Sequence, residues 1–186
     1  MFSQLTLISH ASTRAVRSAA FPLDESIDQA GSQEAALLAK TFRPFAAAWS
    51  SPLKRAIETA EALNLAVKLE PSLTDIDLGR WAGRRLDEVE AEEPYEVARW
   101  LSDPLSAPHG GESIVQLLER VSAWLVSAST NRGRTAAVTH PAVIRAAIVS
   151  ALGAGANSFW RIDVAPLTVV ELSSNGERWA LRSIRN

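Results

Sequence analysis

Short apolar runs alternate along this chain with longer segments of helical periodicity, and this alternation limits the fold more than any other feature. The runs that predict strands cover residues 5–8, 46–49, 67–69, 136–138, 168–172 and 178–184. Between them, helical patterns extend over 29–42, 52–63, 113–130 and 141–152. The alternation predicts an α/β fold: a three-layer α/β/α sandwich around a mostly parallel sheet of about six strands.

Two departures from the alternation are informative. Asn175-Gly176 joins the last two predicted strands, and this pair is a hairpin signal, so we expect an antiparallel edge. Residues 75–108 carry several Gly and Pro and two short helical patterns, over 86–93 and 95–102. We expect a helical insertion at about residues 80–108 near the active site, forming a lid or side wall. A surface excursion without a functional role fits the composition equally well.

Length and composition bound the remaining possibilities. A chain of 186 residues predicts a single domain over 1–186. The net charge of −2 gives no field that favours nucleic acid, and the absence of cysteine excludes disulfides and thiolate chemistry. The start, Met1-Phe2-Ser3-Gln4, lacks the features of a secretory signal, and residues 136–156 are interrupted by His140, Pro141 and Arg145. We therefore expect a cytoplasmic protein without a membrane partner; nothing in the sequence indicates an oligomeric state.

Two of the three histidines follow apolar runs. His10 comes after the run at 5–8, and His140 after the run at 136–138. In open α/β sheets, ligands bind beyond the carboxyl ends of the strands. Because imidazole titrates near neutrality, two imidazoles in one crevice suit catalysis. The alternative is a pair of histidines whose hydrogen bonds are satisfied near strand ends.

The segment 50–60 also points to an anion site. Ser51 is a candidate N-cap and Pro52 a candidate first helical residue, so we expect a helix to begin there. Arg55 then lies on the first turn, where free N–H groups and a guanidinium fork favour phosphate. The alternative is an arginine that faces solvent.

Together these segments resemble the histidine phosphatase superfamily, also called phosphoglycerate mutase-like, over nearly the whole chain. Ser9-His10-Ala11-Ser12-Thr13 corresponds to Arg-His-Gly-x-Thr, and residues 51–60 carry Ser-Pro-Leu-x-Arg-Ala-x-x-Thr-Ala intact. Residues 73–83 resemble Leu-x-Glu-x-x-Phe-Gly-x-Trp-x-Gly, and Gly110-Gly111-Glu112-Ser113 resembles the Gly-Glu-Ser turn. The segment around His140 is similar to the last signature of the family.

The resemblance implies a phosphomonoester hydrolase that acts through a phosphohistidine on a small phosphorylated substrate, without a metal or other cofactor. His10 is then the nucleophile, while Arg55 and His140 neutralise the phosphoryl oxygens. Asp75 occupies the position of the general acid, a role for which its pKa must rise. Ser9, Thr13 and Arg14 complete the candidate phosphate-binding set.

Smaller alternatives stay open around these roles. Asp77 either raises the pKa of Asp75 as a neighbouring carboxylate or points to the opposite face, and Glu25 is a second candidate acid. His109 is expected to be a turn histidine. Trp81 and Trp160 are candidates either for the core or for contact with a ligand.

Three departures from the family pattern bear on activity. Ser9 replaces the first arginine, and loss of one charge-assisted phosphate contact costs about 1.5–3 kcal/mol. Ala11 replaces a glycine, which restricts the backbone, and Pro141 has no N–H to offer. Candidate replacements for the missing guanidinium are Arg14, Arg17, Arg80, Arg84 and Arg85. The alternative function is a non-catalytic or weakly active phosphate-binding protein; a phosphoglycerate mutase is a third.

Overall fold

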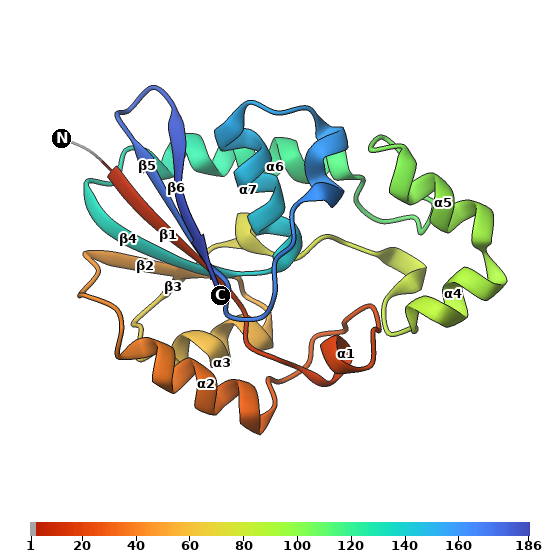
Figure 1. Cartoon of the computed structure of the whole chain (residues 1–186), viewed down its shortest axis with the longest axis horizontal. Helices are drawn as coiled ribbons and strands as arrows, with labels where there is room; N and C mark the ends of the chain where they lie inside the picture. Colours follow the sequence, from red (N-terminus) through yellow and green to blue (C-terminus); the bar gives the residue numbers. More distant parts are fainter. Residues whose placement is uncertain (1–2) are drawn as a thin grey trace.

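The computed structural model describes residues 3–186, in which six strands form one mixed sheet in the order β3-β2-β4-β1-β5-β6 (Figure 1). Met1 and Phe2, the start of the segment expected to lack a secretory signal, lie outside the described residues. The strands are β1 (Ser3–Ser9), β2 (Ala47–Ser50), β3 (Lys68–Leu69), β4 (Gly133–Thr139), β5 (Val169–Ser174) and β6 (Trp179–Arg185). The first four are parallel to one another, and β5 is antiparallel to both β1 and β6. The predicted mostly parallel sheet with an antiparallel edge is confirmed.

Helices cover both faces of the sheet. On one face lie α6 (Ile114–Ala128) and α7 (Pro141–Leu152), and on the other lie α2 (Gln29–Ala39) and α3 (Lys54–Ala62) (Figure 1). Adjacent strand residues point to opposite faces. Leu7 therefore belongs to the α6–α7 core, while Ile8 belongs to the α2–α3 core. The expected three-layer α/β/α arrangement is confirmed.

One predicted helix start is wrong. Helix α3 begins at Lys54 with Leu53 as its N-cap, rather than at Pro52 with Ser51 as its cap. The backbone N–H of Ser51 donates to Val138 O (3.0 Å), which keeps Ser51 in register with the sheet. The Ser51 hydroxyl accepts from Leu53 N–H (3.2 Å) and also contacts His140, so its hydrogen bonds serve the site as well as the turn. The predicted start of α7 at Pro141 is confirmed.

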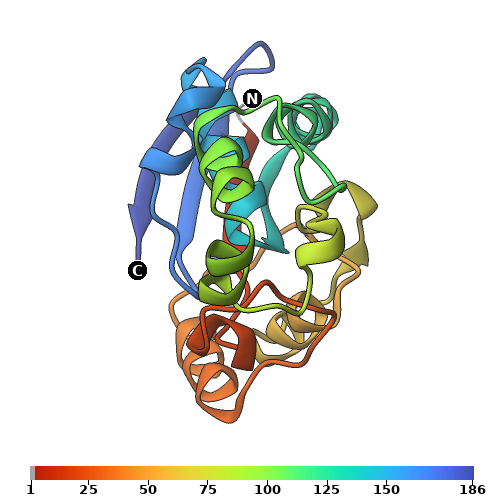
Figure 2. The same cartoon turned by 90° about the vertical axis from the view of Figure 1, so that its right-hand side faces the viewer.

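The segment expected to be a helical insertion contains η2 (Gly79–Trp81), α4 (Leu86–Glu92) and α5 (Pro94–Ser102). Seen from their side of the molecule, α4 and α5 lie in front of the sheet (Figure 2). They share a small core, composed of Phe21, Leu78, Trp81, Val89, Val97 and Trp100. Gly79, at φ +48°, packs so tightly on the carbonyl of His109 that a Cβ would collide with it. The segment is therefore held against the loop that precedes α6.

Three short elements complete the description: α1 (Arg14–Arg17), η1 (Pro71–Leu73) and η3 (Ala156–Arg161). Among residues 3–186, no helix combines the length and the apolar character that crossing a bilayer requires.

Candidate active site

The structure brings together His10, Arg55, Asp75 and His140 from four separate segments. The rings of His10 and His140 lie 5.3 Å apart, centroid to centroid. Asp75 Oδ2 lies 2.7 Å from Arg55 Nη2 and 3.5 Å from His140 Nδ1. His10 follows β1 and His140 follows β4, and these strands are neighbours in parallel register, which explains why the two imidazoles meet.

His10 is held in one tautomer by its own backbone. Its Nδ1 lies 2.8 Å from the carbonyl oxygen of Ala11, which accepts only from a protonated nitrogen. The lone pair is therefore on Nε2, and no hydrogen bond within residues 3–186 occupies that atom. Burial lowers the pKa of His10, although the Ala11 carbonyl opposes the shift, so the ring is neutral at neutral pH.

The loop after His10 is fixed by packing. Ala11 N–H donates to Thr59 Oγ1 (2.9 Å), and that hydroxyl donates to Arg55 O (2.6 Å). Gly31 of α2 lies against Ser12 with no room for a Cβ. Ala11 has no positive φ, so the replacement of glycine at this position strains nothing.

His140 takes its tautomer from Ser51. The Ser51 hydroxyl lies 2.7 Å from His140 Nε2 and accepts from Leu53 N–H, which leaves its own hydrogen for the imidazole. Nε2 is then the acceptor and Nδ1 carries the proton; Nδ1 makes no hydrogen bond in the described part of the chain, and Asp75 Oδ2 lies 3.5 Å from it. Burial lowers the pKa of His140 to about 3, despite the opposing effect of Asp75. His140 is therefore a neutral donor at the site.

The Arg55–Asp75 pair contradicts one expectation. Arg55 is 1% exposed, and its Nη1 donates to Leu23 O (2.9 Å) while its Nη2 donates to Asp75. Burial acts to raise the pKa of Asp75, but the charge of Arg55 and the hydrogen bond from its guanidinium hold that pKa below its usual value. The expected rise in the pKa of Asp75 is therefore wrong for the site without substrate. There, Asp75 is an ionised carboxylate that forms an ion pair with the Arg55 guanidinium.

A second arginine, Arg120, was not identified from the sequence. It donates two hydrogen bonds to the Glu112 carboxylate (2.8 and 2.7 Å) and two more to the carbonyls of Ser72 (2.8 Å) and Thr74 (3.0 Å). These bonds fix the backbone directly before Asp75. The only sequence signal is the spacing of Glu112 and Arg120 on either side of the start of α6.

The two other candidate carboxylates accept hydrogen bonds from nearby backbone N–H groups. Asp77 Oδ1 accepts from Gly79 N–H (2.8 Å), and Asp77 is absent from the groups that shift the pKa of Asp75. Glu25 accepts from Ala15 N–H (3.2 Å), and its charge acts to raise the pKa of His10.

Three residues that were expected to contact phosphate, Ser9, Thr13 and Arg14, make no hydrogen bond to this cluster in the described part of the chain. Ser9 is fully buried, and its hydroxyl has no hydrogen-bond partner in the described part of the chain. Thr13 caps α1 by accepting from Val16 N–H (3.3 Å). Arg14 is exposed and lines a separate hollow together with Glu25.

The other arginines proposed to replace the missing guanidinium form ion pairs of their own. The pairs are Arg17–Asp28, Arg80–Glu93, Arg84–Glu92, Arg84–Glu93 and Arg85–Asp87. One further arginine, Arg145, lines a cavity that His10 and Asp75 also line. Arg145 follows Pro141 by four residues on α7, so both face this cavity, and that spacing is the signal that identifies it.

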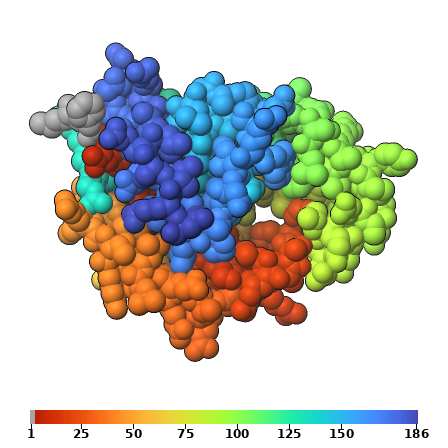
Figure 3. All heavy atoms as spheres, viewed as in Figure 1, coloured from red at the N-terminus to blue at the C-terminus, as the bar shows by residue number. Residues whose placement is uncertain are grey.

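This cavity has a volume of about 180 Å³ and apolar walls. The residues that close it come from three segments: Phe21 and Pro22, Trp100 of α5, and Phe159 and Trp160 of η3. The surface is visibly hollowed where these segments meet (Figure 3). Trp160 therefore lines the cavity, whereas Trp81 is buried in the insertion core.

The third histidine lies apart from the chemistry. His109 is buried against Trp81 and Trp100, and its Nδ1 accepts from Gly111 N–H (3.1 Å). Within residues 3–186, no group of three or more His, Asp or Glu side chains is arranged to hold a metal ion.

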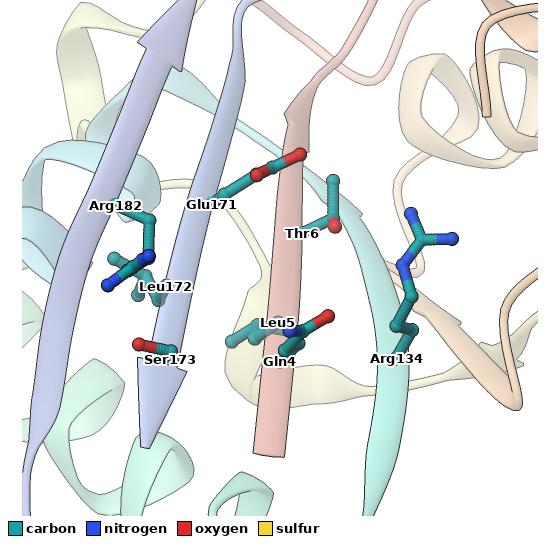
Figure 4. A pocket seen from close by; sticks show the side chains of 8 residues that line it. All are labelled: Gln4, Leu5, Thr6, Arg134, Glu171, Leu172, Ser173 and Arg182. Carbon is teal, nitrogen blue, oxygen red and sulfur yellow. The ribbon is translucent and has the colours of Figure 1, made fainter. Parts of the chain in front are cut away.

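A larger hollow, of about 400 Å³, lies on the sheet beside β1 and β5 (Figure 4). Arg134, Glu171 and Arg182 line it, and neither histidine of the site does. Although this hollow is larger than the cavity beside His10, it is therefore not the candidate active site.

Comparisons with known proteins agree with this geometry. The family model "Histidine phosphatase superfamily (branch 1)" matches residues 5–186. Phosphoserine phosphatase 1 of Hydrogenobacter thermophilus is 32% identical over 161 residues, 81% of this chain and 76% of that protein. Glucosyl-3-phosphoglycerate phosphatase of Mycobacterium tuberculosis is 33% identical over 114 residues, but these cover only 56% of this chain and 51% of that protein.

Solved structures share the fold. A mycobacterial glucosyl-3-phosphoglycerate phosphatase in complex with VO3 superposes with a TM-score of 0.87 at 24% identity, covering 96% of each chain. A putative α-ribazole-5′-P phosphatase from Escherichia coli gives 0.89 at 22% identity, covering 99% of this chain and 96% of the other.

Proposed function

Because the chain belongs to branch 1 of the histidine phosphatase superfamily, we propose that it is a phosphomonoester hydrolase that forms a phosphohistidine on a small phosphorylated metabolite. The observation that carries the proposal is the bond between His10 Nδ1 and Ala11 O, which leaves the Nε2 lone pair free beside Arg55 and His140. A neutral, oriented imidazole next to fixed positive and polar donors is what attack on phosphorus requires. No metal or other cofactor enters the proposed steps.

The first step transfers the phosphoryl group to His10. The substrate phosphate takes the place of the Asp75 carboxylate on Arg55 Nη2 and accepts from His140 Nδ1. Its negative charge raises the pKa of Asp75, which takes up a proton. Nε2 of His10 then attacks phosphorus, the bond from phosphorus to the leaving oxygen breaks, and Asp75 gives its proton to that oxygen.

The second step returns the enzyme to its starting state. Water attacks phosphorus, Asp75 accepts one proton of that water, and the bond between phosphorus and Nε2 breaks. Phosphate leaves, and Asp75 releases this proton to solvent and pairs with Arg55 again. Because an aspartate is one methylene shorter than the family's glutamate, the support of its backbone by Arg120 is part of what holds it within reach.

Ser9 supports a second candidate function. Its buried hydroxyl has no partner, and no guanidinium is present where the family carries the first arginine. A protein with this pocket that binds phosphorylated ligands but turns them over slowly or not at all is the alternative proposal.

The experiment is hydrolysis of 4-nitrophenyl phosphate, with mass-spectrometric trapping of phosphohistidine under alkaline conditions. We expect wild type to release phosphate and to carry a phosphoryl group on His10, and we expect His10→Gln to do neither. His109→Gln is the matched control, since it removes a buried imidazole outside the site and should still form phosphohistidine at His10.

Two outcomes would change the assignment. Activity that survives in His10→Gln contradicts the phosphohistidine mechanism. No turnover in wild type, with turnover gained in Ser9→Arg, supports the binding protein instead.

A further inference from the structure

The walls of the cavity beside His10 suit an apolar group. Phe21, Trp100, Phe159 and Trp160 supply aromatic faces and edges, and the Trp100 and Trp160 rings meet edge to face at 4.6 Å. For comparison, an apolar cavity of about 150 Å³ takes up benzene. At about 180 Å³, this one accommodates a group of roughly one ring.

Arg145 places one cation in this apolar wall. Its Nε donates to Ile162 O (2.8 Å), and its guanidinium carbon lies 5.6 Å from the Trp160 ring centroid and 5.8 Å from that of Phe159. No hydrogen bond within residues 3–186 occupies its two terminal nitrogens. The side chain is thus anchored at one end, with two parallel donors available to a ligand.

The carboxylates around Arg145 are few. Asp163, which is exposed, and Asp75 are the acidic groups that act on it. Asp75 is committed to Arg55 in the free site and to proton transfer in the proposed reaction. A ligand ammonium group therefore finds no free acidic partner among the lining residues of this cavity, whereas an anionic group finds a guanidinium.

From these contacts we propose that the cavity selects phosphomonoesters whose alcohol portion is an apolar, ring-sized group bearing a carboxylate, and that Arg145 binds this carboxylate. The proposal rests on the proposed function, because it places the transferred phosphoryl group at His10. A planar guanidinium fork matches a carboxylate with two parallel hydrogen bonds.

The test compares three benzyl phosphates that differ only in the substituent at the para position of the ring. The substituents are carboxyl, hydrogen and aminomethyl. We measure kcat/KM by phosphate release for wild type, Arg145→Gln and Arg145→Lys. In wild type we expect the carboxyl compound to exceed benzyl phosphate by about 10- to 100-fold, as a charge-assisted pair allows, and the aminomethyl compound to be the poorest.

The variants locate the effect. Arg145→Gln should lower kcat/KM for the carboxyl compound far more than for benzyl phosphate, so that the ratio of the two falls close to one. Arg145→Lys should keep part of the ratio, because it retains the charge without the fork. Arg182→Gln, on β6 in the separate hollow of Figure 4, is the matched control and should leave the ratio unchanged.

Binding gives a readout that does not need turnover. The dissociation constants of the corresponding non-hydrolysable benzylphosphonates, measured by calorimetry, should follow the same order in wild type and lose it in Arg145→Gln. Thermal melts confirm that each variant is folded.

Two results would overturn the inference. If wild type hydrolyses the three compounds with equal kcat/KM, the cavity does not select a carboxylate. An equal loss for all three compounds in Arg145→Gln means that Arg145 acts on the phosphoryl group or on the fold. If the phosphonates show the expected order but no phosphohistidine forms, the proposed catalysis fails and the inferred selectivity stands.

Discussion

Breaking the Arg55–Asp75 pair should destabilise the protein in a way that depends on pH. The Arg55 side chain is 2% exposed and that of Asp75 14% exposed, and their atoms lie 2.7 Å apart. Removing one partner of such a pair typically costs about 3–5 kcal/mol, because the other charge stays buried. Asp75 keeps its bond from Ile76 N–H and some exposure, so for Arg55→Gln we expect the lower end, about 3 kcal/mol at pH 7.5.

The direction of the pH effect follows from the lowered pKa of Asp75. In wild type, a carboxyl whose folded pKa is depressed contributes stability above its unfolded pKa and loses it as pH falls through the folded value. Arg55→Gln removes a major cause of the depression, so the pKa of Asp75 rises and the carboxyl is neutralised on mild acidification. The stability deficit of the variant should therefore shrink between pH 7.5 and pH 5.

Urea unfolding followed by circular dichroism measures both effects in a double-mutant cycle. Wild type, Arg55→Gln, Asp75→Asn and the double variant are compared at the two pH values. We expect a coupling energy of at least about 1.5 kcal/mol at pH 7.5. If the two substitutions add within about 0.5 kcal/mol, and the deficit of Arg55→Gln is the same at both pH values, the pair does not set the charge state of Asp75.

Three further substitutions test the supporting contacts. Ser51→Ala removes the hydroxyl that assigns the His140 tautomer and should lower kcat/KM by about 5- to 30-fold, whereas Ser51→Thr should retain most of it; phosphate-release assays measure both. Arg120→Met leaves two backbone carbonyls and a carboxylate without their donor and should cost about 1–3 kcal/mol in urea unfolding, with a lower kcat; unchanged kcat would exclude a role in placing the acid. Gly79→Ala should lower stability by more than about 2 kcal/mol, because its Cβ meets backbone, while Gly110→Ala has open space and should cost about 1 kcal/mol for its positive φ alone; equal losses would refute the packing argument.

The architecture was predictable because its signals are local. A run of apolar residues marks a buried strand and helical spacing marks a buried face, and both depend only on near neighbours in the chain. Pro141 at the start of α7 and Asn175-Gly176 between β5 and β6 are signals of the same kind. The same signals place His10 and His140 after strands of one sheet, but the two imidazoles meet because β1 and β4 are neighbours in parallel register, which the sequence did not predict.

Charge states and partners were decided only by the tertiary structure. The lowered pKa of Asp75 depends on Arg55, which is 20 residues away in the chain. The hold of Arg120 on the segment before Asp75 and the position of Arg145 at the cavity likewise depend on how distant elements pack. Electrostatic interaction and hydrogen bonding act over a few ångströms of space, whatever the separation along the chain. The sequence by itself therefore determined which chemical groups this protein carries to the ends of its strands, and the packing decided which of them are charged and face one another.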